Sequence, residues 1–123
     1  MIKVAIIEDD VAIAQMYRMK FEAEEGYEVE VAHNGKLGLQ LAESMKPDII
    51  LLDLMMPEMT GDEMLTRLRK KDWGKKIKVF ILTNMGEQEM PDIVKTLNVI
   101  AYIVKADMTP RQVFNLIKTP NPS

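Results

Sequence analysis

Residues 49–61, which are Ile-Ile-Leu-Leu-Asp-Leu-Met-Met-Pro-Glu-Met-Thr-Gly, are the segment most informative about the fold. The run Ile49–Leu52 is continuously apolar and of strand length, which is typical of a strand covered on both faces in a parallel sheet. Asp53 ends this run directly. Taken alone, Asp53 could merely cap a turn before Pro57. Its role therefore depends on the residues at the ends of the other strands of the sheet.

Four other segments have the length and composition of strands. Three are continuously apolar except for Lys3, which indicates that they too are buried on both faces. The fourth alternates apolar and acidic residues, which suits an exposed edge strand. In chain order the four segments are Ile2–Ile7, Tyr27–Ala32, Val79–Leu82 and Ile100–Val104.

Between the strands, apolar residues recur with the period of a helix in five separate segments. These segments run from Ile13 to Phe21, Leu37 to Met45, Met64 to Leu68, Ile93 to Leu97 and Val113 to Ile117. Capping boxes at Thr60 and Thr109 mark helix starts, and Asn98 stands where a left-handed cap would end the fourth helix. Five strand–helix units with short connections predict an α/β domain with a five-stranded parallel sheet.

Composition restricts the class of protein. The chain has 123 residues, the length of one domain. Its net charge of −3 disfavours direct nucleic-acid binding, and the absence of cysteine excludes disulfides and thiolate metal sites. No stretch has the length of a membrane span, so we expect a cytoplasmic protein without membrane contact. The charges from Arg67 to Lys71 indicate a solvated helix end, and residues 119–123 a flexible tail or linker stub.

Chemically active side chains come directly after four strands, at the edge where an open α/β sheet places its ligand site. In chain order they are Glu8, Asp9, Asp10, Asp53, Thr83, Asn84 and Lys105. Each alone has an ordinary explanation, such as a solvated turn, a helix cap or a surface lysine. Together, clustered carboxylates favour a hard cation such as Mg²⁺, while a lysine and a hydroxyl can hold a phosphoryl group. Asp53 is the best-placed nucleophile, since an aspartate can form an aspartyl phosphate.

Four motifs in this order resemble the receiver domains of bacterial two-component response regulators, including the stand-alone chemotaxis regulator. The motifs are Ile-Ile-Glu8-Asp9-Asp10, Leu-Leu-Asp53-Leu-Met-Met-Pro57 with Gly61, Leu82-Thr83-Asn84 and Tyr102-Ile-Val-Lys105. Each is weak by itself, and their joint order and spacing make the set specific. The resemblance covers residues 2–118 and implies a receiver domain over residues 1–118. The implied fold is a flavodoxin-like, doubly wound sheet in the order 2-1-3-4-5 with five helices.

The resemblance also implies roles for the acidic residues. Asp53 would accept a phosphoryl group from the phosphohistidine of a sensor histidine kinase or a phosphotransfer protein. Asp9 and Asp53 would bind Mg²⁺ directly, and Glu8 would reach the ion through water. Met55 would contribute its backbone carbonyl to the same metal site.

The remaining motif residues are implied to sense the phosphoryl group. Lys105, the Thr83 hydroxyl and the backbone amide of Asn84 would contact its oxygens. Tyr102 would turn inward when Thr83 moves. The surface of the fourth helix, fifth strand and fifth helix would then shift between states and contact a downstream effector.

Three features bear on how closely the chain matches the family. The family usually has proline after Lys105, joined by a cis bond, whereas this chain has Ala106. A cis bond before alanine would cost about 2.5–4 kcal/mol, so we predict a trans bond. Asp107 adds an acid that could compete for Lys105. Met55 and Met85 match two positions that tune phosphoryl lifetime in the family. Because neither side chain can orient a water, we predict slow self-dephosphorylation.

The residues leave two other functions open. A pseudo-receiver would be an interaction module that takes no phosphate; Ala106 favours it and the complete set of site residues argues against it. A haloacid-dehalogenase-type phosphohydrolase also uses a strand-end aspartate. That class usually has a second aspartate where this chain has Met55, and 123 residues leave no room for a cap domain. The resemblance implies a signalling protein rather than a turnover enzyme, with its kinase, its output and any dimerisation on activation open.

Overall fold

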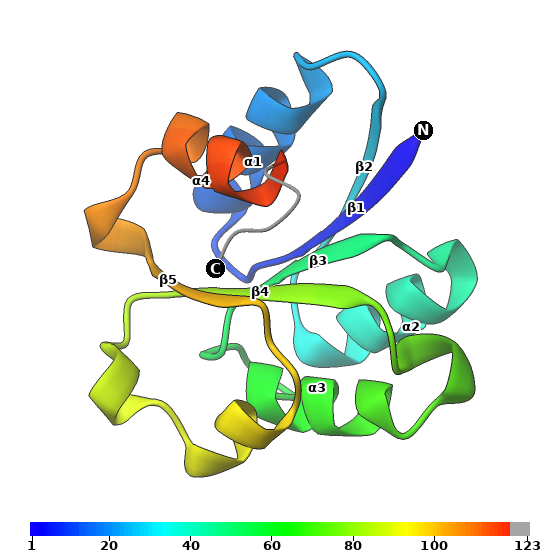
Figure 1. Cartoon of the computed structure of the whole chain (residues 1–123), viewed down its shortest axis with the longest axis vertical. Helices are drawn as coiled ribbons and strands as arrows, with labels where there is room; N and C mark the ends of the chain where they lie inside the picture. The colour runs from blue at the N-terminus through cyan, green and yellow to red at the C-terminus, as the bar shows by residue number, and fades with distance from the viewer. Residues whose placement is uncertain (119–123) are drawn as a thin grey trace.

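The protein forms one parallel five-stranded sheet with helices on both faces (Figure 1). A computed structural model describes residues 1–118, so the tail or linker expected over residues 119–123 lies outside the described part. The spatial order is β2-β1-β3-β4-β5, as the resemblance implied, with the alternating strand β2 at the edge. The strands are β1 (Ile2–Ile7), β2 (Tyr27–Ala32), β3 (Ile49–Leu52), β4 (Lys78–Thr83) and β5 (Ala101–Val104).

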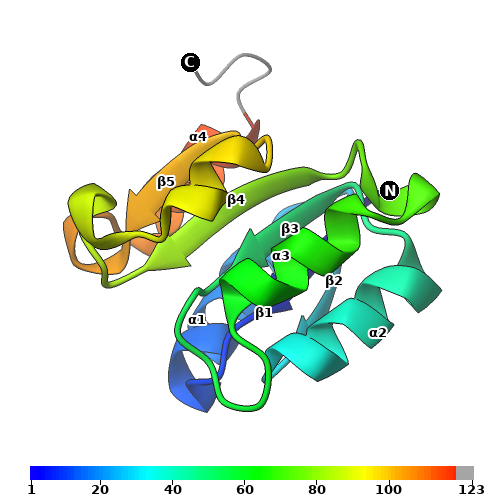
Figure 2. The ribbon, with the colours of Figure 1, turned by 90° about the horizontal axis from the view of Figure 1, so that it is seen from below.

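Four α-helices cover the sheet in two pairs. α1 (Val11–Glu22) and α4 (Pro110–Lys118) lie on one face, and α2 (Gly35–Met45) and α3 (Gly61–Arg69) lie on the other (Figures 1 and 2). Each face has its own core of buried apolar side chains. Coverage on both faces explains why β3 and most of β1 and β4 are continuously apolar. None of the helices in residues 1–118 combines the length and apolar character that a membrane span needs.

The helix starts show which capping signals the chain uses. The box at Thr109 is confirmed: Gln112 N donates to Thr109 Oγ1 at 3.2 Å, and Thr109 N donates to Gln112 Oε1 at 2.8 Å. The box predicted at Thr60 is wrong, because its side chain makes no cap hydrogen bond. Glu63, expected to reach back to Thr60, instead pairs with Arg67 at 3.0 Å one turn further along α3.

The prediction of a fifth α-helix, between β4 and β5, is wrong. This segment contains two short 3₁₀ turns, η2 (Glu87–Glu89) and η3 (Asp92–Thr96), seen as separate turns in Figure 1. Pro91 has no amide hydrogen and directly precedes η3, and Asn98 adopts the predicted left-handed conformation with φ of 58°. Only a few residues, several of them β-branched, lie between these limits, which is too short for a stable α-helix. The described residues therefore hold four α-helices.

The register of the sheet brings the carboxyl ends of four strands to one edge. Ile7 pairs with Leu52, and Leu52 with Ile81, so the residues just after β1 and β3 are neighbours. Thr83 pairs with Val104, which places the residue after β5 next to the end of β4. The predicted site residues therefore start from adjacent strands of a buried sheet.

Candidate functional site

The end of β1 supplies carboxylates in different environments. Glu8 is 1% exposed, and its carbonyl oxygen accepts a hydrogen bond from His33 Nδ1 at 3.0 Å. Asp10 caps α1, because its Oδ1 accepts from Ile13 N at 3.0 Å, while its own amide donates to Glu8 Oε2 at 3.1 Å. Asp9 between them is exposed. The turn therefore buries Glu8 and presents Asp9 to solvent.

Asp53 lies at the end of the central strand β3 and is 5% exposed. Its amide donates to the carbonyl of Ile7 at 3.0 Å, and its Oδ1 accepts from Met55 N at 3.3 Å. Gly61, the first residue of α3, packs against the same loop. A Cβ at this position would lie 2.2 Å from the Asp53 carbonyl oxygen, so only glycine allows α3 to approach so closely.

Lys105 joins the carboxylates of the two strands. Its Nζ contacts Glu8 Oε1 and lies 3.3 Å from Asp53 Oδ2, with 11% of its side chain exposed. Burial raises the pKa of Glu8 from 4.5 to about 7, and the hydrogen bond with Lys105 offsets only part of this effect. Burial also acts to lower the pKa of Lys105, but its contacts with Glu8 and Asp53 outweigh burial and raise it. Lys105 therefore remains a cation between two buried acids.

These groups line a pocket of about 220 Å³ at the carboxyl edge of the sheet. It brings together all but one of the predicted site residues: Glu8, Asp9, Asp53, Met55, Thr83, Asn84 and Lys105. Two further lining residues, Asp10 and Ile13, come from the start of α1. The sequence already placed Asp10 among the acids at the strand ends, whereas Ile13 resembles an ordinary core residue of a helix and no signal marked it as part of a site.

The exception among the predicted residues is Tyr102. Its side chain packs against the core on the face of α2 and α3, and its hydroxyl lies 3.4 Å from the carbonyl oxygen of Val94 in η3. Thr83 is fully buried at the end of β4, and its Oγ1 accepts from Met85 N at 3.3 Å. Both residues thus contact the segment that joins β4 to β5.

The loop after Lys105 shows how the chain accommodates alanine. The Lys105–Ala106 bond is trans, as predicted, and a short 3₁₀ turn, η4 (Lys105–Asp107), begins here. Asp107 is exposed, and within residues 1–118 the ion pairs of Lys105 are with Glu8 and Asp53 only. Ala106 therefore leaves the Lys105 side chain in the pocket.

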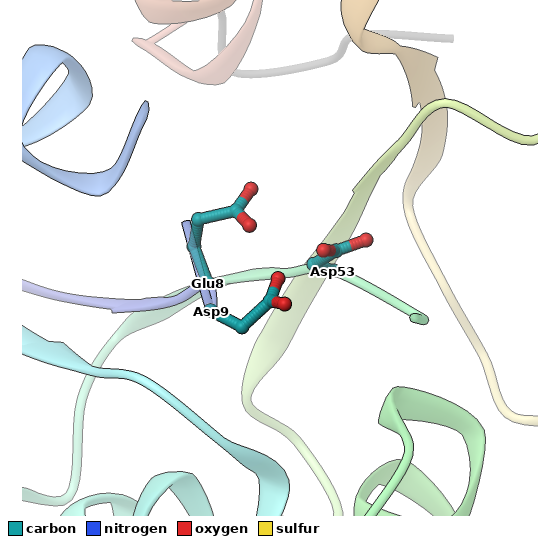
Figure 3. Close-up of side chains that lie close together, drawn as sticks. All are labelled: Glu8, Asp9 and Asp53. Atoms are coloured by element: carbon teal, nitrogen blue, oxygen red, sulfur yellow. The ribbon is translucent and has the colours of Figure 1, made fainter. Parts of the chain in front are cut away.

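The carboxylates of Glu8, Asp9 and Asp53 are arranged as a group that could hold a cation. One oxygen from each lies within 4.8 Å of the others, and Figure 3 shows these side chains extending from the ends of β1 and β3. Carboxylate oxygens are the hard ligands that Mg²⁺ prefers, usually together with water. Four acids line the pocket against one lysine, so a divalent cation would relieve their repulsion. The donor set fits Mg²⁺.

The fold and the pocket together define a class of protein: a doubly wound α/β domain with an acidic, phosphoryl-compatible site at the carboxyl edge of its sheet. The chain belongs to the response regulator receiver domain family, whose family model matches residues 4–118. Acceptance of a phosphoryl group is the standard function of this domain.

Several response regulators are similar to this chain in sequence or in structure. The nitrate/nitrite response regulator protein NarL of Escherichia coli K12 is 43% identical over 88 residues, 70% of this chain and 38% of that protein. The phosphate regulon transcriptional regulatory protein PhoB of Rhizobium meliloti is 34% identical over 111 residues, 88% of this chain and 47% of that protein. The chemotaxis response regulator CheY4 of Vibrio cholerae superposes with a TM-score of 0.86 at 29% identity, covering 96% of this chain and 97% of that chain. The chain spans about a quarter to about half of the length of the curated relatives it matches.

Proposed function

We propose that this receiver domain accepts a phosphoryl group on Asp53 from the phosphohistidine of a sensor histidine kinase or a phosphotransfer protein, in a Mg²⁺-dependent reaction. The observation that carries the proposal is the convergence of Asp53, Thr83 and Lys105 with three further carboxylates in one small pocket. Asp53 is favoured as the acceptor because β3 is the central strand. It therefore lies between the carboxylates at the end of β1 and the hydroxyl that ends β4.

The transfer requires one bond to form and one to break. A carboxylate oxygen of Asp53 forms the new P–O bond while the P–N bond of the phosphohistidine breaks. The electron pair of the P–N bond returns to the imidazole nitrogen. Lys105, already 3.3 Å from Asp53 Oδ2, would pair with a phosphoryl oxygen. The Thr83 hydroxyl would donate a hydrogen bond to a second phosphoryl oxygen. These contacts match the charge that the phosphoryl group carries through the transfer.

The acidic residues divide into two roles in this proposal. Asp9 and Asp53 would hold Mg²⁺ directly, Glu8 would reach it through water, and Met55 would contribute its backbone carbonyl. When bound, the ion supplies positive charge against the phosphoryl oxygens. Within residues 1–118, Lys105 is the one cation paired with the buried acids Glu8 and Asp53, which supports a site built for a second cation.

The contacts of Thr83 support a conformational switch. Its Oγ1 accepts from Met85 N, and the Tyr102 hydroxyl reaches Val94 in η3. Movement of Thr83 toward a phosphoryl oxygen therefore alters contacts of the whole segment between β4 and β5. We place the output surface on η3, β5 and α4, because η3 takes the place of the helix expected there. A downstream effector protein would bind this surface in one of its two states.

The proposed protein is a stoichiometric signalling component of the cytoplasm rather than a turnover enzyme. It catalyses its own phosphorylation and a slow dephosphorylation. The pseudo-receiver remains the second candidate, on the single observation that Ala106 comes directly after Lys105.

Intact-mass measurement after incubation with Mg²⁺ and acetyl phosphate tests the proposal. We expect the mass of one added phosphoryl group, which Asp53→Ala and omission of Mg²⁺ both abolish. Asp48→Ala is the matched control, because this exposed aspartate lies at the other end of β3 and its variant should be phosphorylated normally. A protein that is folded by circular dichroism but gains no phosphoryl group with Mg²⁺ present would favour the pseudo-receiver.

A further inference from the structure

A second hollow lies at the amino end of the sheet, opposite to the pocket that contains Asp53. It is a groove of about 550 Å³ bordered by the starts of β1, β3 and β4, by η1 (Asp72–Gly74) and by the end of α4. Four isoleucines form an apolar floor, and three of them are more than nine-tenths buried, so the floor is fixed by the core. They are Ile2, Ile49, Ile77 and Ile117. The residues assigned to phosphoryl transfer do not line this groove.

The rim of the groove is basic. Lys76, Lys78 and Lys118 line it with exposed side chains, and none of them forms an ion pair within residues 1–118. Asp48 is the one acid among the described lining residues, and its Oδ2 accepts a backbone amide hydrogen bond at 2.8 Å. The lysines belong to a wider asymmetry, because residues 67–78 hold seven of the 16 lysines and arginines but one of the 19 acids. The remainder of the chain is therefore strongly acidic.

An aromatic side chain completes the groove. Trp73, the only tryptophan of the chain, lines it and is half-buried, with Lys46 Nζ 4.5 Å from its ring centroid. An indole ring offers a broad apolar contact together with one polar N–H. The groove thus combines an apolar floor, an aromatic wall and three cations that have no carboxylate partner in the described part of the chain.

We propose that this basic groove binds a short acidic segment of a partner protein, in which an apolar side chain stands between carboxylates. The apolar side chain would pack on the isoleucine floor beside Trp73, and the carboxylates would pair with Lys76, Lys78 and Lys118. The volume of the groove lies in the range of pockets that hold small-molecule ligands. More than one residue of the segment therefore fits into it. The inference is independent of phosphoryl transfer to Asp53, because the two hollows lie at opposite ends of the sheet.

Charge distribution favours a short acidic segment over other polyanions. A long nucleic acid would extend from the groove over the acidic remainder of the chain and be repelled there. An anionic membrane surface has no protruding apolar side chain that could fill the concave floor of the groove. A short segment satisfies the local positive charge and the apolar floor together.

The fluorescence of Trp73 reports on the groove without interference from other tryptophans. The probe is an acetylated and amidated peptide, Asp-Glu-Leu-Glu-Asp, titrated into the 123-residue protein. We expect a saturable change in emission, with an affinity that falls as the salt concentration rises, since exposed charge pairs are screened.

Matched variants separate the charge of the groove from the charge of the whole protein. Lys76→Gln/Lys78→Gln should weaken binding about fivefold, which corresponds to about 1 kcal/mol. Lys36→Gln/Lys95→Gln removes the same charge from exposed positions elsewhere and should change the affinity less than about twofold.

A second peptide, Asp-Glu-Gly-Glu-Asp, tests the apolar floor and should bind more weakly than the leucine peptide. Equal affinity for the two peptides, an equal loss in the two double variants, or no saturable change at millimolar peptide would each overturn the proposal. Oligothymidylate or phosphatidylglycerol vesicles that bind more tightly than the peptide, with the same dependence on Lys76 and Lys78, would overturn it by assigning a different class of partner.

Discussion

The two ends of β3 each carry an aspartate, and the two residues have opposite surroundings. Asp53 at the carboxyl end is 5% exposed and lies in a pocket beside Lys105 and Glu8. Asp48 at the amino end is exposed, accepts a backbone hydrogen bond from Lys3, and borders the open basic groove. One residue type thus fits a chemical role at one end of a strand and a local structural role at the other.

Register and burial, rather than residue type, create this difference. Parallel register gathers acids, a hydroxyl and a lysine from four strands at the carboxyl edge, where exclusion of water strengthens their interactions. At the amino edge the lysines remain in water, where screening leaves each pair with little energy. Charge substitutions at the carboxyl edge should therefore change stability, and matched substitutions at the amino edge should not.

The largest expected contrast is between two lysines. Lys105→Met leaves Glu8 and Asp53 buried without a cation, so we expect it to lower the free energy of unfolding by about 3 kcal/mol at about pH 8 without Mg²⁺. Lys78→Met, at the exposed start of β4, should change it by less than about 0.5 kcal/mol. Urea unfolding measures both, and Mg²⁺ should restore part of the loss in Lys105→Met. Equal losses for the two variants would show that burial does not separate the two edges.

Two glycines provide a second contrast, between a constrained and an open backbone. In Gly61→Ala the new Cβ would meet the Asp53 carbonyl oxygen at 2.2 Å, so the loop must move at a cost of about 2 kcal/mol. The shift should also slow phosphorylation by acetyl phosphate. At Gly86 the nearest atom, Glu89 Oε1, is 3.6 Å from the added Cβ, so Gly86→Ala should be close to neutral. Thermal unfolding and intact mass measure the two effects, and unimpaired phosphorylation of Gly61→Ala would show that the loop tolerates the side chain.

The carboxyl-edge pocket was predictable from sequence because it obeys a rule of topology. Strands recognised by continuous apolar runs place the next residues of the chain at one edge, so Asp53 and Lys105 could be brought together without knowledge of their distance. The capping box at Thr60 and the helix around Val94 were not predictable in the same way. Glu63 had a competing partner in Arg67, and the few residues between Pro91 and Asn98, several of them β-branched, form a 3₁₀ turn in spite of their apolar period.

The groove at the amino end of the sheet could not be predicted from the sequence, because no rule of topology places its residues together. The charges of Arg67 to Lys71 were interpreted as a solvated helix end. This is wrong for Arg69, whose half-buried guanidinium donates to the backbone carbonyl oxygens of Leu97, Gly74, Ile77 and Asn98. The floor of the groove comes from residues far apart in the chain, among them Ile2, Ile49 and Ile117. No period or motif links these positions, so only the packed structure shows that the basic segment borders a hollow.

The pH dependence of Mg²⁺ binding gives a smaller contrast. Burial raises the pKa of Glu8 to about 7 in the metal-free protein, so the fold favours the neutral acid. The stability this group contributes is complete below about pH 4.5 and is lost as the pH rises through about 7. Because Mg²⁺ and the proton compete, Mg²⁺ should raise the melting temperature more at about pH 8 than at about pH 5.5. Glu8→Gln should weaken this dependence and Asp48→Asn should retain it; a Mg²⁺ effect independent of pH in the unmodified protein would argue against a role for Glu8 near the ion.

The smallest expected effect concerns the lifetime of the phosphoryl group. Met55 is 60% exposed and lines the pocket of Asp53, where its thioether cannot orient a water for attack. Met55→Asn would add an amide able to hold such a water, and phosphate loss measured by intact mass should become about fivefold faster, about 1 kcal/mol in the barrier. Met19→Asn is the matched control, because Met19 is 63% exposed on α1 and does not line the pocket, so the rate should not change. If the unmodified protein loses its phosphoryl group as fast as Met55→Asn, the apolar side chain does not protect it, and exposure of Asp53 rather than the residue at 55 sets the lifetime.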